Sequence, residues 1–349
     1  MARPVAAIVS FRLGGTDGVA VEAAKWSGAL SVLGFDVRTV AGEGPVDRLV
    51  AGLAMAATDP PTPGEVEAAL EDADLVVVEN LCSLPLNEPA AAVVAAVIRD
   101  RPAVLHHHDL PWQRAQFAAS PPPPDDPAWV HVTVNDRSRR ELADVGIEAT
   151  VILNAFDVDP ARGDREATRR ALGLPGATRL VLQPTRAIPR KNVAGSIALA
   201  EDLGATFWLL GQAEDGFGPE LDRLVTGARC PCVLGAASLG RGGRVVDAYA
   251  ACDVVVLGST WEGFGNPAIE SAVHHRPLAI GPYPVAAELA AFGFRWFAHD
   301  DPSAVAAFLD APDPSLLEHN HQVARQHFAL RDLPGRIRRL FESARWRFP

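Results

Sequence analysis

Residues 254–270 read VVVLGSTWEGFGNPAIE, an apolar run followed by a loop with glycines and then by a segment typical of a helix start. The aliphatic run at 254–257 predicts a buried strand. Asn266 suits the cap of the next helix, and Pro267 suits its first turn. A strand, a loop and a helix in succession form the repeating unit of parallel α/β sheets. Ligands bind beyond the carboxyl ends of such strands, where residues 260–270 fall.

The same alternation extends outward through most of the chain. Short β-branched runs alternate with Ala- and Leu-rich segments, a pattern that predicts parallel sheets with helical crossovers. The polar stretch NAFDVDPARGDR at 154–165 carries Pro and Gly and separates two series of such runs. We therefore expect two doubly wound domains of α/β class. The expected strands are 5–10, 37–40, 75–78, 103–107, 131–134 and 149–153 in the first series, and 180–183, 206–210, 232–234, 254–257, 278–280 and 295–297 in the second.

Size and composition agree with two globular domains. The chain has 349 residues, of which 48% are hydrophobic and 21% charged, enough apolar content for packed interiors. The formal net charge of −11 argues against a nucleic-acid binder, which needs a basic surface. Apolar runs such as 90–98 are far shorter than the ~20 residues of a membrane helix, and residues 1–11 lack a signal-peptide cleavage pattern. The cysteines lack the spacing of zinc or redox motifs, so we expect reduced thiols in a cytoplasmic protein.

Two acids flank the loop after the strand at 254–257. The positive end of a helix dipole accounts for one glutamate near a helix start, but not for both Glu262 and Glu270. A capping box would place its acid one residue before Glu270. Gly263 and Gly265 leave backbone amides open to a hydroxylated ligand. The loop therefore predicts a ligand site.

A second group of candidates is basic. In PTRAIPRKN at 184–192, Arg186, Arg190 and Lys191 stand between a strand end and a helix start. Cations there oppose the helix dipole, whereas an anion would be bound by the helix amides and the basic side chains together. We expect a phosphate site; the alternative is a solvated basic loop.

The first strand is followed by RLGGTDG at 12–18, whose glycines permit close approach of a diphosphate or a sugar. The spacing of Gly14, Gly15 and Gly18 is not G-x-G-x-x-G. Asp36 precedes the second expected strand, whereas a ribose-binding acid would follow it. Both features disfavour a dinucleotide-dependent oxidoreductase.

A histidine triplet stands at the carboxyl end of the strand expected at 103–107, in LHHHDLPWQR. Adjacent residues of an extended segment alternate in direction, so at most two of the three histidines can share one ligand. Metal binding is therefore disfavoured. His108 suits hydrogen bonding to a substrate oxygen, and Trp112 offers a flat face to a sugar ring. For His106 and His107, exposure in a loop is the competing interpretation.

These segments together resemble the retaining glycosyltransferases of the GT-B fold, above all family 4, and the resemblance spans nearly the whole chain. In that family an E-x7-E motif follows a strand of the C-terminal domain, and Glu262 and Glu270 have this spacing. The resemblance implies that Glu262 lies beside the donor sugar and that Glu270 bonds the ribose hydroxyls. It implies backbone contacts to the sugar from Phe264, Gly265 and Asn266.

The resemblance also covers residues outside this motif. Arg186 and Lys191 match a basic pair that contacts the donor diphosphate. Gly15, which follows Gly14, matches the N-terminal glycine loop, and His108 matches a histidine that contacts the donor sugar.

Two further segments fit the same family. VILNAFD at 151–157 is similar to the linker that enters the second domain, although it lacks the usual Pro and Gly. LLGQ at 209–212 is similar to the turn on the nucleotide side, which places Gly211 among the expected donor contacts.

The C-terminal stretch PGRIRRLFESARWRF at 334–348 mixes arginines with apolar residues. A basic amphipathic helix can lie on anionic lipid. The resemblance implies instead a terminal helix that packs on the N-terminal domain. We favour packing, because the acidic remainder of the protein would be repelled by an anionic surface.

The resemblance implies two Rossmann-like GT-B domains facing across a cleft: an acceptor domain at 1–155, a donor domain at 156–330 and a terminal helix at 331–349. It implies transfer of a hexose-type sugar from a nucleotide-diphosphate donor, with retention, to an acceptor that the sequence does not identify. We expect no cofactor and no metal ion, since basic side chains can stabilise the leaving diphosphate. Other sugar-nucleotide enzymes, such as a 2-epimerase or a phosphorylase, and a non-catalytic sugar-nucleotide binding protein remain alternatives.

Overall fold

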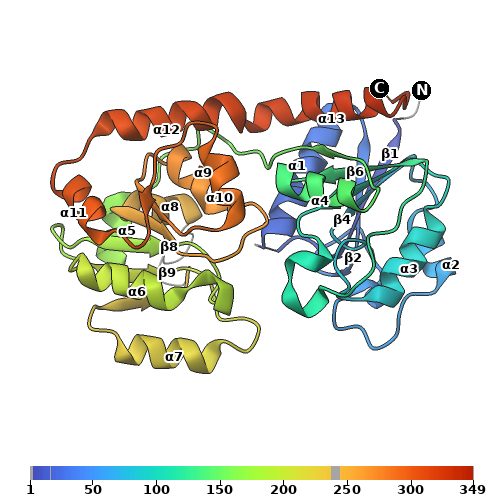
Figure 1. Ribbon diagram of the computed structural model, residues 1–349. Coiled ribbons are helices and arrows are strands. Elements are labelled where there is room, and N and C mark those ends of the chain that lie inside the picture. Colours follow the sequence, from blue (N-terminus) through green and yellow to red (C-terminus); the bar gives the residue numbers. More distant parts are fainter. Residues whose placement is uncertain (1–2, 16, 237–243, 349) are drawn as a thin grey trace. The chain divides into compact units, whose positions relative to one another are not determined.

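The computed structural model describes residues 3–15, 17–236 and 244–348. The chain divides into two compact units, one formed by Met1–Ala155 with Leu330–Pro349 and the other by Phe156–Ala329. Each unit is built on its own parallel sheet with helices on both faces (Figure 1). The predicted α/β class with doubly wound sheets is confirmed.

The N-terminal unit has the strand order β3-β2-β1-β4-β5-β6-β7. Its central strands are nearly continuous apolar runs, because helices cover both faces of the sheet and leave no side for solvent. The strands are β1 (Val5–Arg12), β2 (Asp36–Glu43), β3 (Arg48–Leu49), β4 (Leu75–Glu79), β5 (Ala103–His107), β6 (Trp129–Thr133) and β7 (Ala149–Val151).

The helices of this unit pack two apolar clusters against the sheet. One cluster contains Trp26 and Phe35, and the other contains Leu53 and Leu70; all four side chains are fully buried. The elements are α1 (Gly18–Val32), α2 (Pro63–Ala69), α3 (Glu88–Val97), α4 (Asp136–Asp144) and α13 (Leu333–Ser343), with short 3-10 turns η1 (Ala51–Leu53), η2 (Pro111–Gln113), η3 (Ala115–Phe117) and η6 (Leu330–Asp332).

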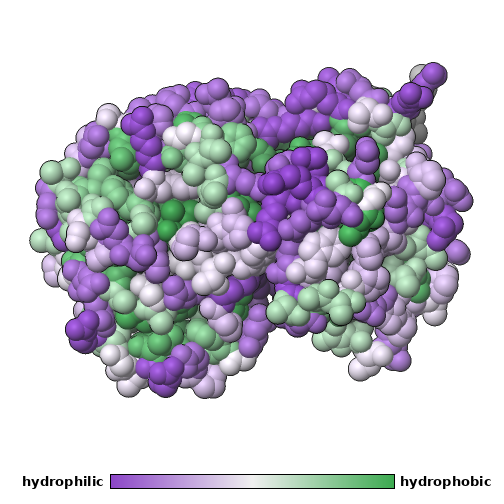
Figure 2. Space-filling model, in the orientation of Figure 1, coloured by the Kyte–Doolittle hydropathy of each residue, from purple (hydrophilic) through white to green (hydrophobic). Residues whose placement is uncertain are grey.

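Helix α13 packs along α1 within the same unit (Figure 1). Ile337, Leu340 and Phe341 are buried in the cluster that contains Trp26. Arg338 and Arg339 are exposed, and the upper edge of Figure 2, where α13 lies, is largely hydrophilic. The apolar face of this helix is therefore used for packing within the unit.

The C-terminal unit has the strand order β10-β9-β8-β11-β12-β13. Strands β8, β9 and β11 are buried along their whole length, as a covered parallel sheet requires. The strands are β8 (Leu180–Gln183), β9 (Thr206–Leu209), β10 (Cys232–Leu234), β11 (Val254–Leu257), β12 (Leu278–Ile280) and β13 (Phe297–Ala298). The helices are α5 (Arg165–Ala171), α6 (Val193–Asp202), α7 (Gly218–Gly227), α8 (Val245–Ala251), α9 (Asn266–Val273), α10 (Pro284–Ala290), α11 (Pro302–Asp310) and α12 (Pro314–His327), with the 3-10 turn η4 (Pro189–Lys191) before α6.

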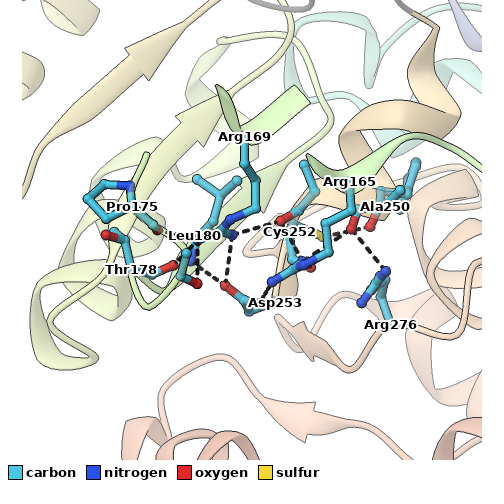
Figure 3. Close-up of polar contacts among 12 residues, drawn as sticks. Arg165, Arg169, Pro175, Thr178, Leu180, Ala250, Cys252, Asp253 and Arg276 are labelled. Atoms are coloured by element: carbon cyan, nitrogen blue, oxygen red, sulfur yellow. Dashed lines mark hydrogen bonds and ion pairs between the residues drawn. The ribbon is translucent and has the colours of Figure 1, made fainter. Parts of the chain in front are cut away.

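An arginine network joins α5 to the end of α8 (Figure 3). Arg165 donates to three successive carbonyl oxygens at residues 250–252 and to Asp253 Oδ1. Arg169, which is buried, donates to the Ala251 carbonyl at 3.0 Å. The last carbonyls of a helix lack partners within it, so the two guanidinium groups satisfy groups that burial would otherwise penalise.

Two expectations about strands need correction. The last expected strand, 295–297, forms instead at Phe297–Ala298, and β3 was not predicted. Both are two-residue strands at a sheet edge, where no buried apolar run marks them. No helix among the described residues combines the length and apolar character that a bilayer crossing demands.

Candidate functional site

Three loops of the C-terminal unit meet at the carboxyl edge of its sheet. They follow the neighbouring strands β9, β8 and β11, which lie side by side in that order. Parallel strands bring their carboxyl ends to one edge, so segments far apart in sequence become neighbours. The loops contain Gly211, the basic residues at 186–191 and the stretch at 258–265.

Glu262 lies at the centre of this edge and is buried. Its Oε1 accepts hydrogen bonds from Lys191 Nζ and, at 2.6 Å, from Ser259 Oγ. Its Oε2 accepts from Arg190 at 3.1 Å. Burial by itself raises the pKa of Glu262, but the charges of Lys191 and Arg190 and these hydrogen bonds bring the net pKa below its usual value. Glu262 is thus held as an ionised acceptor.

Lys191 is buried beside Glu262 at the start of α6. Burial lowers the pKa of Lys191, and the charge of Glu262 opposes that shift. The next residue, Asn192, adopts a left-handed conformation with φ 49° and accepts a hydrogen bond from the Gly195 amide at 3.1 Å. Helix α6 therefore begins directly after this lysine, and the buried cation lies next to the N-terminus of the helix.

Arg186 lies in the same loop but has a different partner. Its Nη1 donates to Glu214 Oε2 at 2.6 Å, and both side chains are about one-third exposed. A Cβ on Gly211 would lie 2.5 Å from Arg186 Cα and 2.5 Å from the Thr185 carbonyl oxygen. Glycine at position 211 therefore permits the close contact between the loops after β8 and β9. Arg186 and Lys191 belong to one edge, yet each is paired with its own glutamate.

The loop before α9 depends on a glycine. Gly265 has φ 94°, and a Cβ there would lie 2.1 Å from Tyr283 Oη. Tyr283 Oη donates to the Phe264 carbonyl oxygen at 3.3 Å, and the Phe264 ring packs near Phe156 at a centroid distance of 6.2 Å. The sequence predicted that Asn266 would cap α9, but the cap position is occupied by Gly265 and Asn266 is the first helical residue.

Glu270 lies one turn further along α9, and its Oε2 accepts a hydrogen bond from Tyr249 Oη at 2.5 Å. Tyr249 is fully buried, and its ring stacks on His274 at a centroid distance of 4.6 Å. Burial, together with the charge of Glu270, raises the pKa of Tyr249 well above its usual value, so this hydroxyl is a permanent donor. It orients the carboxylate of Glu270.

In the N-terminal unit, the glycine loop is shaped by its neighbours. Asp17 caps α1 by accepting from the amides of residues 19 and 20, and it pairs with Arg12 at 3.2 Å. Gly14 has φ 75°, and a Cβ there would lie 2.5 Å from Pro45 Cγ. A Cβ on Gly15 would lie 3.3 Å from Asp17 Oδ2. Thr16 lies outside the described residues.

The histidine triplet is buried, which corrects the alternative of exposed loop histidines. His108 Nε2 and His106 Nδ1 lie 2.7 and 2.9 Å from the same atom, Oε2 of Glu79. Burial alone raises the pKa of Glu79, but the charges of the two histidines and their hydrogen bonds lower it to about 2. The pKa of His108 is raised despite burial by this carboxylate, so His108 and Glu79 form an ion pair.

The middle histidine points to the other face of the strand and joins a polar chain. Ser83 Oγ lies 2.6 Å from His107 Nδ1, and His107 Nε2 lies 2.9 Å from His131 Nδ1. His131 Nε2 lies 3.1 Å from Asp125 Oδ1. The expected alternation of the triplet is therefore present, with two histidines on one face and one on the other.

Several residues that build these sites were not singled out from the sequence. They are Glu79, Ser83, Glu214, Tyr249, Ser259 and Tyr283. Glu79 carried a usable signal, since it is the one charged residue in the otherwise apolar LVVVE strand and stands at its carboxyl end. Trp112, expected to face a sugar, donates to Glu141 Oε2 at 3.0 Å and packs in a small apolar cluster of its own unit.

Two mannosylglucosylglycerate synthases align with most of this chain. That of Thermotoga maritima is 25% identical over 324 residues, covering 76% of this chain and 75% of the relative. That of Petrotoga mobilis is 24% identical over 367 residues, covering 82% of this chain and 85% of the relative. No family model matches the chain.

Solved structures cover nearly the full length. The Anabaena protein HepE in complex with UDP has a TM-score of 0.70 at 18% identity, covering 97% of this chain and 100% of that one. Sucrose-phosphate synthase from Thermosynechococcus elongatus has a TM-score of 0.73 at 14% identity, covering 98% and 99%. Together with the two parallel sheets, these likenesses show the GT-B fold.

Proposed function

We propose that this protein is a retaining glycosyltransferase that moves a hexose from a nucleoside-diphosphate sugar to a hydroxyl group of its acceptor. The observation that carries the proposal is Glu262, buried and ionised between Lys191 and Arg190, beside the start of α6. A diphosphate needs fixed positive charge and helix amides, and both are present at this edge. The names of the two relatives and the UDP and UDP-glucose complexes of HepE support the same chemistry.

In the proposed reaction the bond between the anomeric carbon and the diphosphate oxygen breaks, and the acceptor oxygen bonds to the same carbon from the same face. The acceptor proton passes to an oxygen of the leaving diphosphate. Lys191 and Arg186 stabilise the charge that grows on this group, and Glu262 keeps Lys191 charged inside the protein. Glu270, oriented by Tyr249, binds the ribose hydroxyls. His108, paired with Glu79, donates to a sugar oxygen.

The proposed catalysis needs no cofactor and no divalent metal, because the two basic side chains supply the positive charge. Purified enzyme should retain its activity after exhaustive chelation. Recovery of a lost activity by magnesium or manganese would contradict this part of the proposal.

The test of the reaction begins with a thermal-shift screen of uridine, guanosine and adenosine diphosphate mannose and glucose, since a ligand that binds the native state raises its melting temperature. Donors that bind are then assayed with glucosylglycerate, the acceptor class that the relatives' names indicate, and with other sugars. Proton NMR of the new linkage reads its anomeric configuration. An inverted product would refute retention.

Donor consumption without any acceptor would favour the epimerase or phosphorylase alternatives, and binding without turnover would favour a non-catalytic role.

A further inference from the structure

A second group of potential ligand atoms lies in the C-terminal unit, at the opposite end of α9 from the Glu262 loop. Here His275 follows the end of α9, and Glu318 and His321 lie one turn apart on α12. One ligand atom from each of the three residues lies within 4.8 Å of the others. Helices α9 and α12 pack against each other, so the fold holds the three side chains together.

His321 is prepared to act as a ligand. It is 7% exposed, and its Nε2 lies 2.7 Å from the Val158 carbonyl oxygen. A carbonyl oxygen only accepts, so Nε2 carries the proton and the neutral ring has its lone pair on Nδ1. Histidines that bind metals characteristically donate their other ring N–H to a carbonyl or carboxylate in this way.

His275 adopts a backbone conformation that glycine usually occupies. Its φ is 51°, at the position just after a helix end where a residue with a Cβ is strained. The turn places the His275 ring 4.2 Å from the His321 ring, centroid to centroid, and its Nε2 3.3 Å from Glu318 Oε2. Two imidazoles therefore meet beside one carboxylate.

The separation of these atoms fits a shared cation as well as an ion pair. Bonds of about 2.0–2.1 Å around a tetrahedral zinc ion place two ligand atoms roughly 3.3–3.5 Å apart, which matches the separation of His275 Nε2 and Glu318 Oε2. In the other histidine group, both nitrogens lie at hydrogen-bonding distance, 2.7 and 2.9 Å, from one oxygen of Glu79. In that group His108 pairs with Glu79, while Glu79 Oε1 and both ring nitrogens of His106 have no hydrogen-bond partner of suitable geometry among the described residues.

The fourth coordination position has room for a further ligand. His275 and His321 both line a pocket of about 430 Å³, to which Arg162 and Arg276 also contribute. Water or a small anion can reach a metal ion from this pocket. Two imidazole nitrogens, one carboxylate oxygen and an open position make up a donor set that zinc prefers and magnesium does not.

We propose that His275, Glu318 and His321 bind a zinc ion that fastens the end of α9 to α12. The site is independent of the proposed transfer reaction, because neither the loop at 258–265 nor the basic residues at 186–191 bind the zinc ion. It stabilises α9, whose N-terminal end directly follows the loop that contains Glu262.

The test uses the full chain with any polyhistidine tag removed and with metal stripped by a chelator. Zinc chloride is titrated by calorimetry, and bound zinc is counted by elemental analysis. We expect one zinc ion per chain, unchanged by millimolar magnesium, and a higher melting temperature in its presence. Glu318→Gln should weaken binding at least tenfold, and the double variant His275→Gln/Glu318→Gln should abolish it. Both side chains are exposed, so these variants should fold; circular dichroism checks this.

His319→Gln is the matched control, since His319 is a partly exposed histidine on the same helix and its partner is the Gly293 carbonyl oxygen. It should bind zinc as the unaltered chain does. The proposal is overturned if the unaltered chain takes up no zinc. It is equally overturned if the double variant still binds one ion with the same affinity, which would move the metal to another group, such as Glu79 with its histidines.

Discussion

Replacing Glu262 by glutamine removes the carboxylate that the structure places against the buried Lys191. The side chains of Glu262 and Lys191 are 8% and 9% exposed, so solvent can do little to compensate the remaining cation. Breaking a buried ion pair by removing one partner costs about 3–5 kcal/mol in the free energy of unfolding. For a chain of this length the melting temperature should fall by at least roughly 6 °C, at ~2–4 °C per kcal/mol.

The stability deficit of Glu262→Gln should depend on pH. Burial already lowers the pKa of Lys191 below 10.5, and Glu262 is the main opposing influence. Without Glu262 the folded-state pKa of Lys191 falls further. Between that pKa and 10.5 the unfolded chain binds more protons than the folded chain, so stability rises with pH in this window. The deficit of the variant relative to the unaltered protein should therefore shrink as the pH is raised from 7 towards 10.

Thermal unfolding monitored by circular dichroism at several pH values measures both effects. Lys191→Met/Glu262→Gln should recover most of the stability, because an uncharged pair of similar size replaces the two buried charges, yet it should remain inactive. Glu214→Gln is the control: its partly exposed pair with Arg186 should contribute less than about 1 kcal/mol. The reasoning fails if Glu262→Gln loses less than about 1 kcal/mol at pH 7, or if the double variant is no more stable than the single one.

Three further changes test other parts of the structure. Gly265→Ala places a Cβ 2.1 Å from Tyr283 Oη at a φ of 94°, so its melting temperature should fall, and adding Tyr283→Phe should restore part of the loss. Tyr249→Phe removes the hydrogen bond that orients Glu270. Because a lost hydrogen bond costs about 0.5–1.5 kcal/mol, the donor KM should rise up to about tenfold with kcat nearly unchanged. An unaltered KM would contradict the role of Glu270. Glu79→Gln should destabilise the protein at neutral pH. The folded-state pKa of Glu79 is depressed to about 2 from 4.5, so the contribution of its carboxylate to the free energy of unfolding is lost as the pH falls through this range. The melting temperatures of the variant and the unaltered protein should therefore converge there. A constant difference would refute the ion pair with His108.

The fold could be predicted largely from local patterns. The apolar runs at 103–107, 180–183, 232–234, 254–257 and 278–280 are strands with the expected bounds. A fully covered parallel strand must be apolar along its length, so its own composition reveals it. The two-residue edge strands β3 and β13 have no such run. They are recognised only by their hydrogen bonds to β2 and β12, which the sequence does not show.

The candidate site could be predicted only in part from the sequence. The sequence placed Glu262 and the basic group at 186–191 in loops after strands, where the structure also has them. The resemblance implied that Arg186 and Lys191 both contact the donor diphosphate, which stays a prediction. The sequence did not indicate that Lys191 pairs with Glu262 and Arg186 with Glu214. These pairings decide which charges are buried and compensated.

The sequence by itself determined the α/β class, most of the elements and the directions of the histidine triplet, because these depend on residues within a few positions of each other. The tertiary structure alone decided that Lys191 meets Glu262, 71 residues away, and that His108 meets Glu79, 29 residues away. The first contact exists because β8 and β11 are adjacent in the sheet although β9 and β10 intervene in the chain; the second exists because β4 lies beside β5. A strand's apolar pattern records that it is buried but not which strand lies beside it, so the partners of buried charges follow from strand order.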